Sequence, residues 1–254
     1  MAPERITYVG HATVLLELGG RRLLTDPVLG PHVLGFIRRH ASAPDPGVGR
    51  DLDAVLISHL HHDHLDFPTL RRIGRDVPVF VPVGAGRTLR LRGFRDVTEL
   101  RPAESATLGT VEITATPATH NARRFKYGRH VDAAGFMVEG ERRVYFAGDT
   151  DLFAGMAALG GDLDAALLPI GGWGPTVGSG HLDPRRAAEA AAMLKPRIAI
   201  PIHWGTMLRL GLGHRAAEIL EQPPRRFAAQ LAERAPGVRA VVLEPGDSVE
   251  LSPC

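Results

Sequence analysis

Residues 58–66 read Ser-His-Leu-His-His-Asp-His-Leu-Asp and hold four histidines and two aspartates. The stretch follows the short apolar run of residues 54–57, which predicts a buried strand that delivers these polar side chains into the loop after it. His59 and His61 are two positions apart, so in an extended chain both imidazoles point to the same side and can bind one ion. Imidazole nitrogen is a good ligand for zinc, and the spacing therefore predicts a metal site.

Asp63 and His64 follow at once, and a chain that turns there can direct them to a second ion close to the first. One carboxylate in each site also neutralises part of the metal charge. A histidine-rich surface loop or an expression tag is the alternative, but neither would follow a buried strand with two acids interleaved. Cys254 is the lone cysteine, so a zinc site built from thiolates and an intramolecular disulfide are both excluded.

The pattern His-x-His-x-Asp-His of residues 59–64 resembles the signature of the metallo-β-lactamase superfamily of binuclear metallohydrolases. The resemblance implies three further ligands at wide spacing, each at the end of a strand. His120, Asp149 and His203 supply them in order, since each follows an apolar run typical of a buried strand. We therefore expect an enzyme with two bound divalent ions, zinc in the first place and manganese or iron as alternatives.

The resemblance also distributes the ligands between the two ions. In this hypothesis each ion is held by three residues of its own, and a further aspartate bridges both ions through its two oxygens. The residues are His59, His61 and His120 for the first ion, Asp63, His64 and His203 for the second, and Asp149 for the bridge. A bridging carboxylate keeps two ions at the roughly 3.5–4 Å separation that two-metal hydrolysis uses. Gly148, just before the bridge, lets the backbone approach closely.

The implied fold is α/β, an αββα sandwich of two mixed sheets with helices on the outer faces. The alternation of strand and helix patterns along the chain agrees with it. Helices are expected to begin after Asp66 and Asp183, which are good N-cap residues, and final strands are expected through residues 241–243. Segments 51–57 and 162–168 both read Asp-Leu-Asp-Ala followed by apolar residues, which indicates two similar halves that face each other.

Segments outside the ligands resemble one branch of the superfamily, which contains N-acyl-phosphatidylethanolamine phospholipase D and, more distantly, ascorbate-phosphate lactonases. They are Gly10-His11-Ala12-Thr13, Leu24-Thr25-Asp26-Pro27 and His181-Leu182-Asp183-Pro184. The resemblance places His11 beneath the metals and lets Asp26 orient a ligand histidine through its free ring N–H. His181 is expected to polarise the substrate or to donate a proton to the leaving group, with a plain helix-flanking histidine as the alternative.

The chemistry that the resemblance implies is hydrolysis. Two cations lower the pKa of a shared water from about 15.7 to about 7, so that hydroxide forms at neutral pH and attacks phosphorus or a carbonyl carbon. Asp63 is the residue best placed to manage the proton. A phosphodiesterase similar to N-acyl-phosphatidylethanolamine phospholipase D is the first hypothesis, and a lactonase or another ester or amide hydrolase is the alternative. A non-catalytic metal-binding protein would usually have lost ligands, and here all of them are present.

The composition agrees with a globular enzyme. The chain has 254 residues, 44% of them hydrophobic and 23% charged, which is enough for one domain spanning residues 1–254. Its net charge of +2 comes with scattered arginines and no basic stripe, so nucleic-acid binding is not expected. No apolar stretch reaches the roughly 18 residues of a membrane span and no signal core is seen, so we expect a cytoplasmic protein, with a homo-oligomer possible.

Substrate recognition is less well defined by the sequence. Residues 28–53 lack a clear period and are expected to contribute part of the pocket, as long irregular segments in compact domains often do. The pair Arg123-Arg124 closely follows one predicted ligand and could reach an anionic group of a small-molecule or lipid-like ester substrate. His62 and His214 are further candidates whose roles stay open, as does the role of Arg123.

Overall fold

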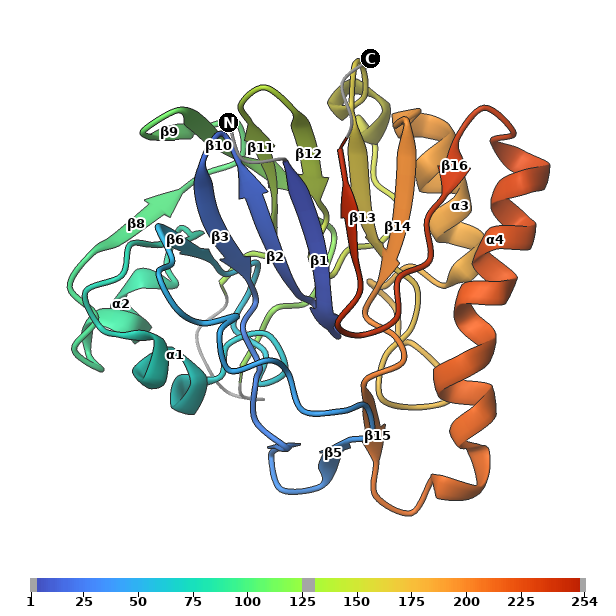
Figure 1. Cartoon of the computed structure of the whole chain (residues 1–254), viewed down its shortest axis with the longest axis horizontal. Coiled ribbons are helices and arrows are strands. Elements are labelled where there is room, and N and C mark those ends of the chain that lie inside the picture. The colour runs from blue at the N-terminus through green and yellow to red at the C-terminus, as the bar shows by residue number, and fades with distance from the viewer. Residues whose placement is uncertain (1–3, 125–130, 252–254) are drawn as a thin grey trace.

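Two seven-stranded mixed sheets lie face to face at the centre of the molecule, and helices cover their outer sides, as a computed structural model of the chain shows (Figure 1). The structure describes residues 4–124 and 131–251. The lone cysteine, Cys254, lies outside the described residues. The arrangement of helix, sheet, sheet and helix confirms the predicted αββα sandwich.

The first sheet has the strand order β17-β1-β2-β3-β6-β7-β8. Its strands are β1 (Arg5–Gly10), β2 (Thr13–Leu18), β3 (Arg21–Thr25), β6 (Ala54–Leu56), β7 (Val79–Pro82), β8 (Val97–Leu100) and β17 (Ser248–Glu250). Neighbouring strands are antiparallel from β17 to β3 and parallel from β3 to β8. The parallel part carries the carboxyl end of β6, from which the predicted metal-binding stretch leaves the sheet.

The second sheet has the strand order β16-β14-β13-β12-β11-β10-β9. Its strands are β9 (Ser105–Leu108), β10 (Val111–Pro117), β11 (Ala134–Glu139), β12 (Arg143–Phe146), β13 (Ala165–Pro169), β14 (Ile198–Ile202) and β16 (Arg239–Ala240). Strands β9 to β12 are antiparallel, whereas β12, β13, β14 and β16 are parallel. The sheet therefore repeats the change from antiparallel to parallel pairing seen in the first.

The helices are mostly short. They are α1 (Phe67–Ile73), α2 (Gly86–Arg90), the 3-10 helix η1 (Met156–Leu159), α3 (Pro184–Leu194), the 3-10 helix η2 (Gly213–Arg215), the π-helix η3 (Ala217–Glu221) and α4 (Gln222–Arg234). Helices α1 and α3 begin where the sequence predicts, because the carboxylates of Asp66 and Asp183 accept hydrogen bonds from backbone N–H groups in the first turn. A cap of this kind contributes about 1 kcal/mol.

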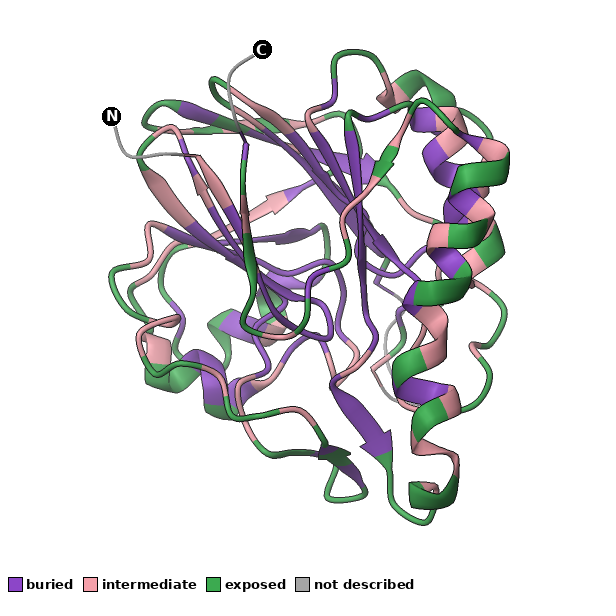
Figure 2. Cartoon of the chain, turned by 45° about the vertical axis from the view of Figure 1, so that its right-hand side comes forward, coloured by how far each residue is buried: buried purple, intermediate pink, exposed green. Residues whose placement is uncertain are grey.

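The alternation of side chains along each strand decides which layer they join. On β6 and β7, Leu56 and Phe80 point inward to the core between the sheets, whereas Val55 and Val79 point outward to a second core under α1 and α2. Both faces of β6 and β7 are therefore apolar, and the strands at the centre of the molecule carry the buried colour along most of their length in Figure 2. These strands are rigid supports for the loops at their ends.

Two aspartates make the same contacts in the two halves of the molecule. Asp53 enters β6, and its carboxylate accepts a hydrogen bond from the N–H of Arg22 at 2.9 Å. Asp164 enters β13 and accepts from the N–H of Arg143, also at 2.9 Å. In both pairs the aspartate N–H returns a hydrogen bond to the arginine carbonyl at 2.9 Å. The similar sequences of segments 51–57 and 162–168 therefore mark corresponding strands in two halves of the molecule that are built alike.

A small third sheet projects from the sandwich below the ends of the central strands (Figure 1). Its strands are β4 (His32–Val33), β5 (Ile37–Arg39) and β15 (Met207–Arg209), in the order β15-β5-β4. Val28, Val33, Ile37 and Met207 form a core of its own. The segment of residues 28–53, which shows no clear period in the sequence, thus contains a short hairpin paired with a strand far along the chain.

The expected strand through residues 241–243 is wrong. The chain leaves the second sheet after β16, although Val241 N–H still donates to the carbonyl of Ala199 at 3.0 Å. It then turns at Gly246, where φ is 106°, and joins the first sheet as β17. Leu243 is buried in the core between the sheets and Val241 packs against that core, whereas the side chain of Val242 is exposed. Among the described helices, none is long and apolar enough to cross a membrane.

Candidate metal centre

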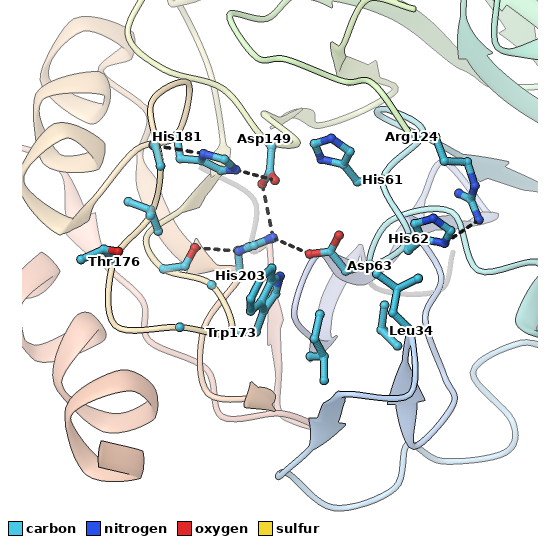
Figure 3. A pocket seen from close by; sticks show the side chains of 17 residues that line it. Leu34, His61, His62, Asp63, Arg124, Asp149, Trp173, Thr176, His181 and His203 are labelled. Atoms are coloured by element: carbon cyan, nitrogen blue, oxygen red, sulfur yellow. Dashed lines mark hydrogen bonds and ion pairs between the residues drawn. The ribbon is translucent and has the colours of Figure 1, made fainter. Parts of the chain in front are cut away.

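The predicted ligands come from the ends of strands in both sheets. His59 follows β6 of the first sheet, whereas His120, Asp149 and His203 follow β10, β12 and β14 of the second. Because the two sheets face each other with these ends at the same edge, the side chains meet between them (Figure 3). Seven residues spread over more than half of the chain thus reach one point.

Three histidines form a first group that could hold a metal ion. Nε2 of His59 lies 2.9 Å from Nδ1 of His61, and Nε2 of His120 lies 3.1 Å from that same nitrogen. His59 is fully buried, while His61 and His120 are partly exposed. The three nitrogens therefore converge from the interior and from the cavity side.

A second group could hold another ion beside the first. Nε2 of His64 lies 3.1 Å from Nε2 of His203, and Oδ2 of Asp63 lies 3.9 Å from each of these nitrogens. His11 completes the group, because its Nε2 lies 3.0 Å from Oδ2 of Asp63. His11, which the family resemblance places beneath the metals, thus contacts the carboxylate of the second group in the structure.

Asp149 lies between the two groups. Its Oδ2 is 3.1 Å from Nε2 of His64 and 3.9 Å from Nε2 of His59, while its Oδ1 is 3.4 Å from Nε2 of His203. Oδ1 is buried and has no hydrogen-bond partner among the described residues. Burying a carboxylate oxygen without a hydrogen-bond donor costs free energy, and a cation bound at this oxygen would offset that cost.

Three of the histidines have one ring nitrogen directed away from the cluster. The hydrogen bond that this nitrogen makes decides whether the other ring nitrogen can bind a metal ion. Nδ1 of His120 and of His203 faces the carbonyl oxygens of Gly180 and Gly171, at 2.9 and 2.7 Å. A carbonyl only accepts, so both Nδ1 atoms carry the proton and both Nε2 atoms present a lone pair. Nδ1 of His64 likewise donates to a carboxylate at 2.7 Å.

Lone pairs that face one another repel, and a cation between them removes the repulsion. Nε2 of His203 carries a lone pair and lies 3.1 Å from Nε2 of His64, so the two atoms repel each other unless His64 carries a second proton or a cation binds between them. Together with the orphan oxygen of Asp149, this geometry fits a bound metal ion, which would take the place of the second proton on His64. The donor set of imidazoles and carboxylates suits zinc, and also iron or manganese.

Asp26 organises the base of the cluster. Its two carboxylate oxygens accept hydrogen bonds from the N–H of Ser58 at 2.7 Å, from Oγ of Ser58 at 2.5 Å and from Nδ1 of His64 at 2.7 Å. Oγ of Ser58 in turn lies 2.9 Å from Nδ1 of His59. Asp26 thereby orients one histidine of each group, directly or through Ser58. The sequence suggests this role for Asp26 but gives no sign of the part played by Ser58.

Three side chains of the cluster sit on strained backbone. The φ angles of His11, Asp26 and His203 are 58°, 34° and 65°, in the left-handed region that residues with a Cβ seldom adopt. Each such residue costs on the order of 1 kcal/mol or more and persists only where its surroundings fix it. The strained residues therefore lie where the direction of a metal-binding side chain has to be fixed.

Burial and neighbouring charges set the pKa values in the cluster. Burial lowers the pKa of His61 to about 4 and that of His203 to about 3, and it holds the pKa of His59 well below its ordinary value. Burial also acts to lower the pKa of His64, but the surrounding carboxylates, Asp149 first, raise it well above its ordinary value. Against the effect of burial, His203 and His64 keep the pKa of Asp149 well below its usual range. The imidazoles of His59, His61 and His203 are therefore neutral, whereas the surrounding carboxylates favour the charged form of His64.

Gly148 allows the strand end that carries Asp149 to pass close to Ser58. Its φ is 59°, and a Cβ added there would lie 2.5 Å from Cβ of Ser58 and 3.3 Å from the carbonyl oxygen of Ala134. Real Cβ atoms do not approach other carbons so closely. A side chain at this position would push the two halves of the site apart.

Replacing Gly148 with alanine is therefore expected to destabilise the protein by more than the roughly 1–2 kcal/mol that left-handed backbone alone costs. Urea unfolding would measure the loss. Gly237→Ala is the matched control, because a Cβ there meets nothing within 4 Å, and it should change the free energy of unfolding by less than about 0.5 kcal/mol. If the two variants had equal free energies of unfolding, the close approach of the backbone at Gly148 to Ser58 would not be needed for stability.

The cluster opens into a cavity of about 380 Å³. His61, Asp63, Asp149 and His203 form its floor (Figure 3). One wall is apolar and consists of residues from the small sheet and the glycine-rich loop, namely Val33, Leu34, Ile37, Trp173 and Val177. The prediction that residues 28–53 contribute to the pocket thus agrees with the structure.

His181 is the predicted proton donor, and it lines the same cavity. Its Nε2 lies 3.4 Å from Oδ2 of Asp149, and its ring lies 4.5 Å from that of His120. Burial lowers the pKa of His181, but the hydrogen bond to Asp149 raises it to a net value above normal. The side chain is partly exposed and can meet a substrate held above the floor.

The remaining candidates divide between the cavity and the surface. His62 lines the cavity, and its Nδ1 lies 3.1 Å from Nη2 of Arg124. Of the arginine pair, Arg124 lines the cavity while Arg123 is exposed outside it. His214 is exposed on η2 and does not line this cavity. The sequence could locate the arginine pair but not decide which of its members faces the site.

Comparison with known proteins gives one consistent result. A family model described as beta-lactamase superfamily domain matches residues 21–204. A metal-dependent hydrolase of Methanopyrus kandleri is 32% identical over 254 residues, which span 97% of this chain and 99% of that protein. N-acyl-phosphatidylethanolamine-hydrolyzing phospholipase D 1 of Caenorhabditis elegans is 34% identical, but the match covers 79% of this chain and only 63% of the nematode protein. A solved metallo hydrolase of Ignicoccus hospitalis has a TM-score of 0.73 at 26% identity and covers 98% of both chains.

Proposed function

This chain is a metal-dependent hydrolase of the metallo-β-lactamase superfamily, and from that premise we propose that it is a binuclear zinc phosphodiesterase. Its substrate would be a small-molecule or lipid-like diester. The observation that carries the proposal is a cation in the cavity wall, Arg124, beside a cluster suited to two divalent ions. The name of the nematode relative, a phospholipase D, points to the same bond.

In this proposal each of the two groups holds one ion. The residues are His59, His61 and His120 for one, Asp63, His64 and His203 for the other, and Asp149 between them. Two divalent ions would supply the Lewis acidity that activates a water near neutral pH and stabilises developing negative charge. Asp63 is an ionised carboxylate at the cavity floor and would take up the proton of that water on Oδ2, with His11 at 3.0 Å to stabilise it.

His181 would act on the opposite side of the substrate. It lines the cavity next to Asp149, and its ring is partly exposed. An imidazolium at this place could transfer the Nδ1 proton, which faces the carbonyl oxygen of Gly178 at 3.2 Å, to the leaving-group oxygen. Asp149 holds the ring in place through the 3.4 Å contact with Nε2.

Arg124 would recognise the negative charge of a phosphodiester. Its Nη1 donates to the carbonyls of Leu60 and Leu65 at 2.7 and 3.0 Å, which fixes the guanidinium at the cavity. Within the described part of the chain, no carboxylate forms an ion pair with it. Burial lowers the pKa of Arg124 to about 10, so the group is still charged at neutral pH. A fixed cation without an anionic partner favours an anionic substrate over a neutral one.

The first test is hydrolysis of bis(p-nitrophenyl) phosphate beside a panel of small lactones. Protein loaded with zinc or manganese would be compared with the same protein treated with a chelator. Cleavage of the diester that disappears with the chelator is the expected result. Opening of lactones without cleavage of the diester would contradict the proposal and identify a lactonase, in which the polar cavity wall would recognise a sugar or a carboxylate.

Replacing Arg124 with methionine is expected to raise KM for the diester about 10- to 100-fold, because a hydrogen bond to a charged group contributes about 1.5–3 kcal/mol. KM for a neutral ester such as p-nitrophenyl acetate should change little. Arg123→Met is the matched control, since the same change is made on the neighbouring exposed residue. Equal effects of Arg124→Met on the diester and on the neutral ester would assign Arg124 to support of the loop instead.

A further inference from the structure

The small sheet of β4, β5 and β15 exposes large apolar side chains at its tip. The exposed fractions of Leu34, Phe36 and Leu210 are 54%, 42% and 55%. Leu210 N–H donates to the carbonyl of Phe36 at 2.8 Å, so the two turns that carry these residues touch. The tip is the part of the small sheet that extends furthest from the sandwich (Figures 1 and 2). Exposed apolar side chains gathered on one projection are typical of a docking surface.

Basic side chains stand directly behind this tip. Arg38, Arg39, His40 and Arg209 line a second cavity of about 470 Å³. No acidic residue lines it, and in the described ranges none of the three arginines forms an ion pair. Arg39 is buried, and its Nη1 has no hydrogen-bond partner in the same ranges. The surface thus combines an apolar tip with uncompensated positive charge.

The tip is continuous with the apolar wall of the metal cavity. Leu34 is exposed at the tip and also lines the cavity, together with Val33 and Ile37 of the same hairpin. Phe36 meets Trp173 of that wall edge to face, with 6.4 Å between the ring centres. An acyl chain could therefore follow apolar side chains from the tip along one wall of the metal cavity.

We propose that Leu34, Phe36 and Leu210 insert into a bilayer that contains anionic phospholipids, while Arg38 and Arg209 contact the phosphates of its head groups. The inference rests on the proposed function, because such a surface serves an enzyme whose diester substrate is held in a membrane. Charge decides between this partner and a second copy of the chain. A symmetric dimer through this face would bring the arginines of two copies together with no acid to balance them, whereas anionic lipid neutralises them.

The test is flotation of the full chain with vesicles of phosphatidylcholine alone or with about one third phosphatidylglycerol. Binding to the anionic vesicles only is expected. The double variant Arg38→Glu/Arg209→Glu should weaken it at least about 25-fold, since each basic side chain near an anionic surface contributes about fivefold. Phe36→Ser/Leu210→Ser should lose binding as well. Leu91→Ser and Arg72→Glu, which change exposed residues elsewhere on the surface, are the controls and should bind like the unchanged protein.

Three results would overturn the proposal. They are equal binding to neutral and anionic vesicles, binding by the two double variants that equals the controls, and a dimer in sedimentation velocity that Phe36→Ser/Leu210→Ser dissociates. None of the four residues in the double variants lines the metal cavity, so hydrolysis of bis(p-nitrophenyl) phosphate should persist in both. If only the docking proposal is wrong, the unchanged protein still cleaves the diester. If the proposed function is wrong, the unchanged protein does not cleave it.

Discussion

Asp149→Asn is expected to lose most of its bound metal and most of its hydrolytic activity. The variant keeps the shape of the side chain but removes the negative charge between two groups of imidazoles. Removing one partner of a buried charge pair costs about 3–5 kcal/mol, which corresponds to a metal affinity weaker by roughly 10²- to 10⁴-fold. Metal content after dialysis and the rate of diester cleavage would both be measured.

Asp151→Asn is the control for this experiment. Asp151 lies two residues further on and forms an ion pair with Arg186 instead of joining the cluster. Its substitution should leave two ions bound and the rate nearly unchanged. If Asp149→Asn also kept two ions per chain, the assignment of Asp149 as the residue between the ions would be wrong.

Asp26→Asn is expected to lower metal affinity about 10- to 100-fold, the usual effect of losing a partner that orients a ligand histidine. Asp26 accepts three hydrogen bonds, from N–H and Oγ of Ser58 and from Nδ1 of His64. An asparagine amide places an NH₂ group against one of these donors in either orientation. His64 then loses its fixed direction, and burial leaves water little access to replace the lost bond.

Zinc affinity measured by competition with a chelating dye would test this, with thermal unfolding as a second readout. Asp66→Asn makes the same chemical change near the cluster, at the N-cap of α1, where asparagine caps as well as aspartate. It should bind zinc normally. Normal zinc affinity in Asp26→Asn would mean that packing alone orients His64.

The sequence predicted the parts of the site that depend on local pattern. His59, His61, Asp63 and His64 follow one buried strand, so their spacing alone indicates a metal site. His120, Asp149 and His203 could be found only by resemblance, because nothing local shows that three distant strands end at one edge. The αββα fold was predicted from the family resemblance, and the similar segments 51–57 and 162–168, each of which contains a central buried strand, agree with it.

Other features depend on contacts that leave no trace in residue type. The carbonyl groups of Gly171 and Gly180 fix two ligand histidines, but every residue has a carbonyl, so no sequence pattern marks them. The β4–β5 hairpin pairs with β15, about 170 residues later in the chain, and its strands are too short to show alternation. Arg124 and Arg123 are adjacent and identical in type, and only the direction of the loop places one in the cavity.

Anomalous diffraction from crystals of the zinc-loaded protein tests the account most directly. Two zinc peaks are expected, one among His59, His61 and His120 and one among Asp63, His64 and His203, with the carboxylate of Asp149 between them. A single peak, or peaks away from these side chains in a protein that still cleaves the diester, would contradict it.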